Sequence, residues 1–382
     1  MPFDQSSIFL AIGLSSAALA LTLFMSWMVG RSQTYLLTWS VGLLVIVAGV
    51  FVFAGFAVPY DAGLQLLSFI LLICGFGLVY AGTMQFCSEQ THWKHAALIS
   101  TIGLLPTVVA FALGYSGTGT IAANCGIGLL LVLTGQQYWY ARFETPLLMT
   151  ANAVLYVITA VSFLACGYEL VRNGQYILDA EPANWAEQVN AFVVIVGLTG
   201  IGALSLTIHQ IRIANRHRSE AMRDPLTGLR NRRGLFDDYP DRAASDATVV
   251  VMDLDHFKAI NDRFGHAAGD RVLREFADII LSNIRLSDIA GRIGGEEFCI
   301  LLSDASPAAA TAMAERIRSR LEAKTFMTSA GAIRATVSAG IAVQSRELES
   351  LQVLLDRADV ALYQAKEAGR NRVHISGLHQ AA

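Results

Sequence analysis

The chain has 382 residues, of which 54% are hydrophobic and only 15% charged, and its mean hydropathy is +0.47. This balance argues against a soluble cytosolic enzyme. A formal net charge of −3 gives no basic footprint for nucleic acid, and five cysteines without metal-ligand spacing predict neither a metal site nor a secreted disulfide framework. Residues 1–211 contain 4 basic and 8 acidic residues, against 24 and 23 in 212–382. The two parts of the chain are therefore expected to lie in different solvents.

The N-terminal part contains long stretches without Asp, Glu, Lys or Arg. A bilayer core about 30 Å thick needs roughly 20 apolar residues per helix. The stretches are 5–30, 32–60, 62–88, 95–141, 145–168 and 188–211. The fourth is long enough for two helices and is interrupted by the turn-forming sequence 114–119. We therefore expect residues 1–211 to form an α-helical multi-pass membrane domain of about seven transmembrane helices. The first has no basic segment before it and is expected to be a retained helix, not a signal peptide.

The basic residues near the ends of these helices predict the orientation. Under a count of seven helices they fall on one side of the membrane: Arg31, Lys94, Arg142, Arg212, Arg216 and Arg218. Since positively charged loops stay in the cytoplasm, we expect a bacterial inner-membrane protein with its N-terminus outside and its C-terminal part cytoplasmic.

Few strongly polar side chains lie within the predicted helices. They are Asn124, Asn152 and His209, for which helix–helix hydrogen bonding is favoured over an ion path. This scarcity argues against a transporter. A sensory role is expected for this part, but its sequence does not identify a ligand.

The C-terminal part alternates between helical and strand patterns. Residues 212–223 are predicted to continue the last membrane helix as a linker. Strands are expected at 247–253, 288–293, 297–302, 333–343 and 371–375, and helices at about 230–243, 267–285, 307–323 and 350–368. This pattern predicts an α/β domain over 224–376, large enough for one core, followed by a tail at 377–382.

Carboxylates occur at two points where this domain could hold a cation. The buried β pattern 249–255 ends at Asp253, and oxygen ligands of this kind suit Mg²⁺, although strand-end aspartates also cap helices. Glu296 and Glu297 follow the turn-forming pair Gly294–Gly295. Two adjacent carboxylates repel each other, so they indicate either a cation site or a solvated acidic turn.

These features belong to an ordered set of motifs. The set comprises 224–229 (DPLTGL) with 231–233 (NRR), 253–258 (DLDHFK), 261–266 (NDRFGH), 269–270 (GD), 294–298 (GGEEF) and 366–371 (KEAGRN). In this order and spacing, the segment 224–376 resembles the GGDEF domain of the diguanylate cyclases. The resemblance covers about 40% of the chain. It implies a central, mainly antiparallel sheet with flanking helices, as in nucleotide cyclases.

The resemblance also implies a metal site. Asp253, the backbone carbonyl of Leu254, and Glu296 would bind Mg²⁺ or Mn²⁺, with up to two ions per active site. Glu296 would assist deprotonation of the ribose 3′-hydroxyl, and Glu297 would support the metal site. Glu in place of Asp at the third signature position is an accepted variant of the family.

A GTP-binding site is implied at matching positions. Asn261 and Asp270 would recognise guanine, with His266 between them. The amides of Phe257 and Lys258 would meet the phosphates at a helix start. The side chains of Lys258, Lys366 and Arg370 would offset the phosphate charge; taken alone, Lys366 and Arg370 also fit surface groups on a helix.

The implied reaction condenses two GTP molecules into cyclic di-GMP and two pyrophosphates, which requires two domains face to face and hence a homodimer. Arg285 and Asp288 match the position of a product-binding inhibitory site, with Arg316 as a weaker candidate. The alternative is a catalytically silent cyclic di-GMP receptor. The presence of Asp253, Glu296, Asn261 and Asp270 argues against it.

Overall fold

The structure is a computed structural model in which residues 5–55, 60–88, 92–239, 247–328, 331–344 and 349–376 are described. The chain divides into two compact units, Met1–Arg212 and Ile213–Ala382. The predicted tail at 377–382 and the end of the helix predicted at 230–243 lie outside the described residues.

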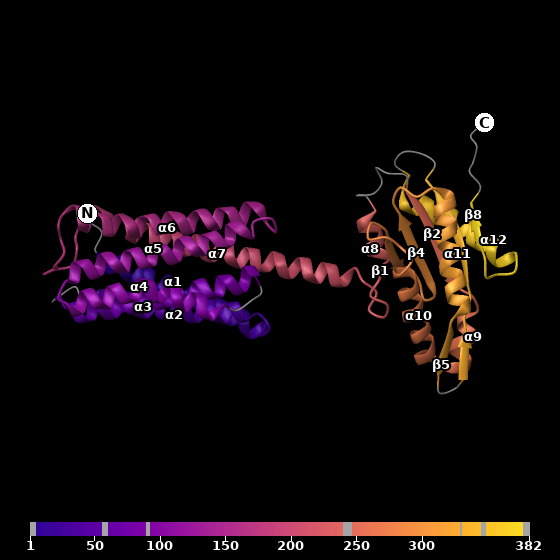
Figure 1. Cartoon of the computed structure of the whole chain (residues 1–382), viewed down its shortest axis with the longest axis horizontal. Coiled ribbons are helices and arrows are strands. Elements are labelled where there is room, and N and C mark those ends of the chain that lie inside the picture. The colour runs from indigo at the N-terminus through magenta and orange to yellow at the C-terminus, as the bar shows by residue number, and fades with distance from the viewer. Residues whose placement is uncertain are drawn as a thin grey trace. The chain divides into compact units, whose positions relative to one another are not determined.

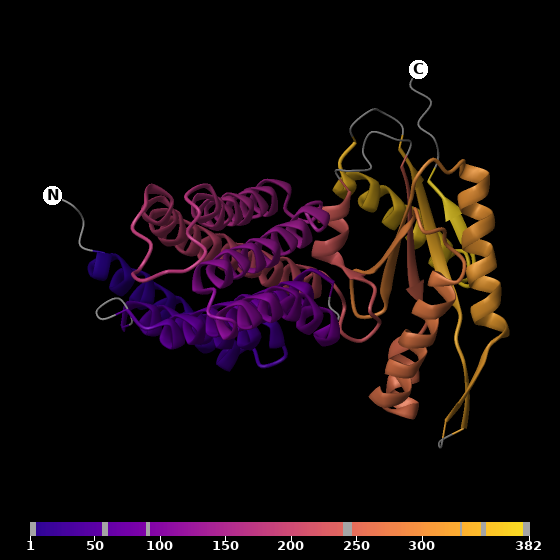
Figure 2. The ribbon, with the colours of Figure 1, turned by 60° about the vertical axis from the view of Figure 1, so that its left-hand side comes forward.

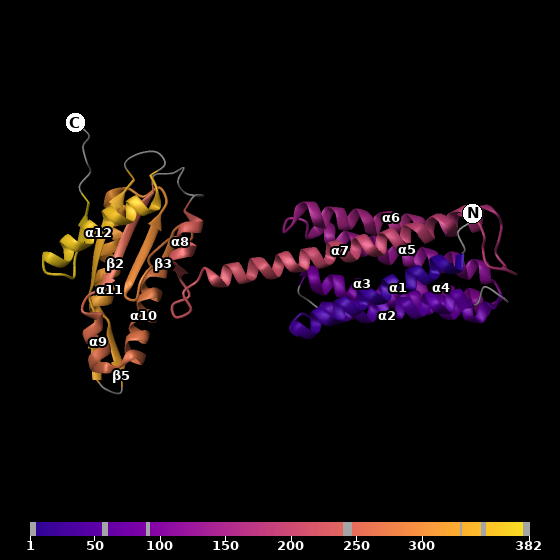
Figure 3. The same cartoon turned by 180° about the vertical axis from the view of Figure 1, so that it is seen from behind.

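Seven long helices form the N-terminal unit and run side by side (Figures 1 and 3). They are α1 (Gln5–Val29), α2 (Thr34–Gly55), α3 (Ala62–Ser88), α4 (Trp93–Ala112), α5 (Ser116–Tyr140), α6 (Pro146–Arg172) and α7 (Trp185–Ala221). By length and composition, all seven are apolar enough to cross a membrane. The expected number of helices is therefore found within the described residues, and α7 continues without a break to Ala221.

The interruption between the fourth and fifth helices is shorter than the sequence predicted. Only residues 113–115 separate α4 from α5, with Gly114 at a φ of +83°, and residues 116–119 begin α5. The loop after α6 explains this difference. Its Tyr176 carbonyl accepts a hydrogen bond from the Thr118 amide at 3.1 Å, and its Leu178 amide donates to Ser116 Oγ at 2.9 Å. These contacts satisfy groups that a free helix start would leave unpaired.

Polar side chains inside the helical unit hydrogen-bond between helices. The Tyr35 hydroxyl lies 2.8 Å from His209 Nδ1, and the Asn152 amide donates to Ser205 Oγ at 3.0 Å. The helix-pairing interpretation of Asn152 and His209 therefore agrees with the structure. At the end of the unit, Arg212 contacts the Glu144 carboxylate at 2.5 and 2.7 Å and donates to the Phe86 carbonyl at 2.8 Å, so it joins α7 to two other segments.

A six-stranded mixed sheet forms the centre of the C-terminal unit, in the order β1-β3-β4-β2-β7-β8. Its strands are β1 (Arg230–Asn231), β2 (Thr248–Leu254), β3 (Ile289–Arg292), β4 (Glu297–Leu302), β7 (Val337–Val343) and β8 (Val373–Ile375). The three inner pairs are antiparallel, and the edge pairs β1–β3 and β7–β8 are parallel. The expected α/β fold with a mainly antiparallel sheet is therefore found.

Helices cover both faces of this sheet. They are α8 (Arg232–Asp238), α9 (Phe257–Phe264), α10 (His266–Leu281), α11 (Pro307–Ala323) and α12 (Leu351–Glu367). Side chains alternate along β2: Val250 and Met252 enter the core that contains α10 and α11, whereas Val249 and Val251 enter the core that contains α8 and α12. By the same alternation, Asp253 belongs to the α12 face.

Two features of the sheet region differ from the sequence-based expectation. The strand predicted at 333–343 is split at Thr336. The Thr336 carbonyl accepts a hydrogen bond from the Asp255 amide, and the Thr336 hydroxyl donates one to the Asp255 carboxylate. The part before the split pairs instead in the separate hairpin β5 (Thr325–Thr328) and β6 (Gly331–Arg334). Figure 2 shows this hairpin extending beyond the six-stranded sheet. The hairpin was not predicted, and for α9 the sequence analysis expected a helix start at Phe257 and Lys258 but not its end at Phe264.

Candidate active site

Asp253 stands at the end of the central strand, where the sheet pairs it with Glu297 of β4 and Ser338 of β7. Asp253 is only 5% exposed. Lys366 of α12 places its Nζ atom 2.8 Å from the Asp253 carboxylate. Burial raises the pKa of Asp253, and the Lys366 ammonium only partly opposes this effect. At the position predicted for a metal ligand, the structure thus has a desolvated carboxylate, that of Asp253, in contact with the Lys366 ammonium.

Glu296 and Glu297 lie beside it because the turn after β3 carries them back to the end of β2. The Glu296 carbonyl accepts a hydrogen bond from the Leu254 amide at 3.2 Å. Partial burial raises the pKa of Glu296, and the negative charge of Asp253 raises it further. The charge of Asp253 therefore disfavours the ionisation of Glu296. Glu297 is exposed at the start of β4.

This donor set fits a divalent cation that is shared with a substrate. No group of three or more His, Cys, Asp or Glu that could hold a metal ion occurs among the described residues. Asp253 and Glu296 supply two carboxylates, and a bound cation would relieve their repulsion. Mg²⁺ commonly takes one or two carboxylates and completes its shell with water and phosphate oxygens.

Asp255, two residues after Asp253, serves a structural purpose that the sequence did not reveal. It is 4% exposed and accepts hydrogen bonds from the Thr336 hydroxyl at 2.8 Å, the Ser338 hydroxyl at 2.7 Å and the Asn371 amide at 3.1 Å. Its carboxylate is thereby satisfied by protein donors. These contacts fix the end of β2 against β7 and the segment after α12.

The helices α9 and α10 carry the residues predicted to bind the nucleotide. Phe257 and Lys258 are the first two residues of α9, so their amides have no acceptor within the helix. Between the helices, Gly265 has a φ of +81°. A Cβ atom at Gly269 would collide with the Asn261 side chain, so this glycine lets α10 approach α9 closely. The approach places Asn261 next to the turn of α10 that contains Asp270.

The remaining predicted nucleotide-binding residues are accessible. His266 is the first residue of α10, and its side chain is exposed, as is that of Lys258. Arg370 follows the end of α12 with a φ of +62°, and its charge acts on Asp253 in the direction that lowers the pKa. The structure therefore brings Asp253, Glu296 and Lys366 together, and it places Arg370 within electrostatic range.

Arg292 is a positioning residue that the sequence analysis did not single out. Its guanidinium donates to the Gly295 carbonyl at 2.6 and 3.3 Å and to the Asp224 carboxylate at 3.2 and 3.3 Å. Asp224 also accepts hydrogen bonds from the amide and hydroxyl of Thr227. Arg292 thus ties the turn that carries Glu296 to the loop at the start of the domain.

The predicted inhibitory residues lie after α10. The Arg285 amide donates to the Asp288 carboxylate at 2.9 Å, which leaves the Arg285 side chain exposed. Arg316 of α11 donates to the side chain and carbonyl of Asn283 at 2.8 and 2.7 Å. Its guanidinium therefore binds Asn283, two residues before Arg285, in the segment that follows the end of α10.

The family of this unit follows from comparison with known proteins. A family model described as "Diguanylate cyclase, GGDEF domain" matches residues 221–372, so this part of the chain is a GGDEF domain. Among curated proteins, the chain is similar to "Diguanylate cyclase A" of Treponema denticola, with 48% identity over 129 residues that cover 34% of this chain and 35% of that protein. It is also similar to "Response regulator PleD" of Caulobacter vibrioides, with 42% identity over 161 residues that cover 40% of this chain and 36% of that protein.

One solved structure is also similar to part of the chain. The coiled coil and GGDEF domain of DgcB from Caulobacter crescentus, in complex with c-di-GMP, is 32% identical, with a TM-score of 0.41, and the match covers 45% of this chain and 94% of that chain. The chain spans about a third of the length of the two curated relatives, 35% and 36%. The similarity therefore concerns the GGDEF domain.

Proposed function

We propose that the protein is a membrane-anchored diguanylate cyclase that converts two GTP molecules into cyclic di-GMP and two pyrophosphates. The observation that carries the proposal is the joint placement of Asp253, Glu296 and Lys366 at the end of the central strand of a GGDEF domain. The paired α9 and α10, which present Asn261 and Asp270 for guanine, support it.

In this proposal the chain's own residues bind and orient GTP. The amides of Phe257 and Lys258 and the side chains of Lys258, Lys366 and Arg370 meet the triphosphate. Asp253, the Leu254 carbonyl and Glu296 hold Mg²⁺ or Mn²⁺, which when bound neutralises charge that develops on the phosphate oxygens. Asn261 and Asp270 pair with the guanine edge, and His266 lies between them.

Glu296 receives the proton in the chemical step, and the neighbouring Glu297 supports the metal site. As the ribose 3′-oxygen of one GTP loses its proton to Glu296, it bonds to the α-phosphorus of the other GTP. The bond from that phosphorus to the bridging oxygen breaks, and pyrophosphate leaves. A second such step closes the ring.

Each domain binds one GTP in this scheme, so the active unit is a homodimer. Product feedback through Arg285 and Asp288, with Arg316 supporting the loop from α11, belongs to the same proposal. An arginine fork beside a carboxylate can bind a phosphate and a guanine edge together.

Membrane anchoring rests on the seven apolar helices of 20–37 residues. Each is long enough to cross a hydrocarbon core about 30 Å thick. Large apolar side chains, such as Leu14, Leu98 and Val161, are exposed on the outside of the helical unit by 58–60%. Arg31 and Arg142 lie in the α1–α2 and α5–α6 loops, and Lys94 is the second residue of α4. In an up-and-down order of helices these three positions fall at the same end, which supports a cytoplasmic location for that end and an external N-terminus.

The test is GTP turnover by the purified full-length protein with Mg²⁺, followed by chromatography for cyclic di-GMP. We expect product from the wild type and none from Glu296→Ala, with GTP binding retained in both. Arg320→Met, which changes an exposed residue of α11, is the matched control and should keep wild-type turnover. If the wild type binds cyclic di-GMP but forms no product, the chain is a receptor and the cyclase proposal is wrong.

A further inference from the structure

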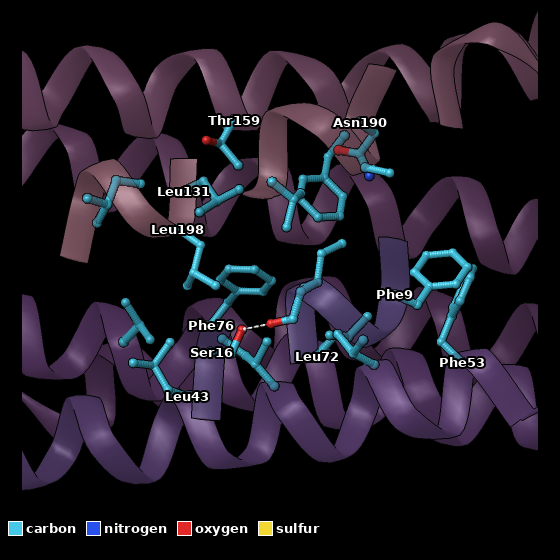
Figure 4. Close-up of a pocket in the computed structure, with 18 of the residues that line it drawn as sticks. Phe9, Ser16, Leu43, Phe53, Leu72, Phe76, Leu131, Thr159, Asn190 and Leu198 are labelled. Atoms are coloured by element: carbon cyan, nitrogen blue, oxygen red, sulfur yellow. Dashed lines mark hydrogen bonds between the residues drawn. The ribbon is translucent and has the colours of Figure 1, made fainter. Parts of the chain in front are cut away.

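The N-terminal unit encloses a cavity of about 170 Å³ (Figure 4). Its lining comes from α1, α2, α3, α5, α6 and α7 and from Pro182 in the loop before α7. An apolar protein cavity of about 150 Å³ is known to hold a benzene molecule. The space in this unit therefore admits a molecule built around one ring.

The cavity wall is mainly apolar and rich in aromatic rings. The aromatic residues include Phe9, Trp39, Phe53, Phe69, Phe76 and Phe163. Figure 4 shows Phe9 and Phe53 toward one end of the cavity, near Asn190, and the leucine side chains of Leu43, Leu131 and Leu198 toward the other. Aromatic faces bind other rings and attract cations.

One amide in this wall has no hydrogen-bond partner among the described residues. Asn124 is 5% exposed and lines the cavity, and none of the described residues hydrogen-bonds to its side chain. By contrast, the Asn190 side chain accepts a hydrogen bond from the Ser162 hydroxyl at 2.8 Å, and the Ser16 hydroxyl donates to the Ile12 carbonyl. The amide atoms of Asn124 are not closed off by the protein, so they are available to hydrogen-bond a polar group in the cavity.

One carboxyl group lines the cavity. Among the described residues that line it, Glu187 alone has a charged side chain, and none of the described basic residues forms an ion pair with it. Its side-chain contact is with the Cys166 thiol, a weak donor. Glu187 lies in the first turn of α7, where the helix dipole stabilises a negative charge. A ligand ammonium placed at Glu187 would hold this carboxyl group in its ionised form and pair with it, whereas an anionic head group would find no cationic partner among the described lining residues.

We propose that this cavity is a binding site for a small aromatic or cyclic amine. The ring occupies the aromatic wall, the ammonium group lies at Glu187, and a polar group of the ligand pairs with Asn124. All of these residues belong to the Met1–Arg212 unit, so the site does not depend on the cyclase proposal.

The test is calorimetric titration of the full-length protein in detergent micelles without GTP. Three probes share a phenyl ring and a short chain but differ in the head group: 2-phenylethylamine, 2-phenylethanol and 3-phenylpropanoate. We expect saturable binding of the amine, about tenfold weaker binding of the alcohol, and none of the carboxylate, because a charge-assisted hydrogen bond is stronger than a neutral one. If no probe saturates, or if all three bind alike, the proposal is wrong.

Variants locate the binding. Glu187→Gln should lower the affinity for the amine about tenfold, to that for the alcohol. Asp179→Asn, which removes an exposed carboxylate from the loop before α7, is the matched control and should change neither the affinity for the amine nor that for the alcohol. Ala191→Phe and, in a separate variant, Leu198→Phe add volume to the cavity wall and should abolish binding of the amine and of the alcohol. Circular dichroism shows which of these variants keeps its helices. Unchanged amine binding in Glu187→Gln, or in a folded phenylalanine variant, would overturn the assignment.

Discussion

Arg292→Met tests whether the turn that carries Glu296 is held in place by Arg292. The substitution removes the guanidinium contacts to the Gly295 carbonyl and to the Asp224 carboxylate. The side chains of Arg292 and Asp224 are only 14% and 17% exposed, so water compensates poorly at that pair. Gly295 is exposed, and water can replace its lost donor. A hydrogen bond to a charged group contributes about 1.5–3 kcal/mol. Counting the Asp224 pair fully and the Gly295 contact in small part gives a loss of about 2 kcal/mol in the free energy of unfolding of this unit.

The unit offers a selective probe of its own unfolding. Cys299 of β4 is fully buried, and the other four cysteines, Cys74, Cys87, Cys125 and Cys166, lie in the Met1–Arg212 unit. With those four replaced by alanine, pulsed alkylation in urea followed by mass spectrometry reports the unfolding of the GGDEF unit alone. A loss of about 2 kcal/mol lowers the urea midpoint by roughly 1 M at a slope near 2 kcal/mol per molar.

The activity of the same variant provides a second measure. Looser placement of Glu296 should lower kcat/KM for GTP between about tenfold and a hundredfold, since small misplacements of reacting groups are costly. Arg320→Met, the exposed control, should change neither the midpoint nor kcat/KM. An Arg292→Met variant with the urea midpoint and kcat/KM of the wild type would refute the positioning role.

Two further predictions concern the same unit. Partial burial raises the pKa of Asp224, but hydrogen bonds from Thr227 and the charge of Arg292 outweigh it and hold that pKa below its ordinary value. Asp224 therefore stabilises the fold at neutral pH, and this contribution is lost as pH falls through the lowered pKa. The urea midpoint of Asp224→Asn should be lower than that of the wild type from pH 7 to pH 5, and the difference between the two midpoints should narrow below about pH 4. A difference that does not change with pH would contradict this prediction. A Cβ atom at Gly340 would collide with the backbone of α12 at Ala358 and Leu362, so Gly340→Ala should cost about 1–3 kcal/mol; an unchanged urea midpoint would show that α12 shifts freely.

Much of the fold could be predicted because its signals are local. Each of the seven long helices corresponds to a long apolar stretch of the sequence. For six of them, the first and last residues lie within a few residues of the predicted bounds, or the helix extends beyond those bounds into neighbouring polar sequence. The start of α5 was missed because Ser116 and Thr118 depend on contacts with the loop after α6. The split of the strand at Thr336 was missed for the same reason, since it follows from hydrogen bonds to Asp255, 81 residues away.

The candidate site divides in the same way. The motif residues Asp253 and Glu296 were named from their positions in the sequence, and the structure brings them together. The family resemblance implied a role for Lys366 toward phosphate. Its contact with Asp253 was not predicted, because that contact depends on the alternation of β2, which places Asp253 on the α12 face. Arg292 and Asp255 were missed because an arginine before a turn and an aspartate after a strand have no distinctive local pattern; their partners identify them.

The cavity of the N-terminal unit has a consequence for how the protein is made. Its wall includes α1, near the start of the chain, and α7, the last helix of the unit, and Leu19 of α1 packs against Gly202 of α7. During synthesis the pocket cannot close until α7 has joined the earlier helices, so a truncated chain lacking α7 has no complete site. Since the second unit begins at Ile213, the pocket can be complete in a nascent chain whose GGDEF domain has still to be translated.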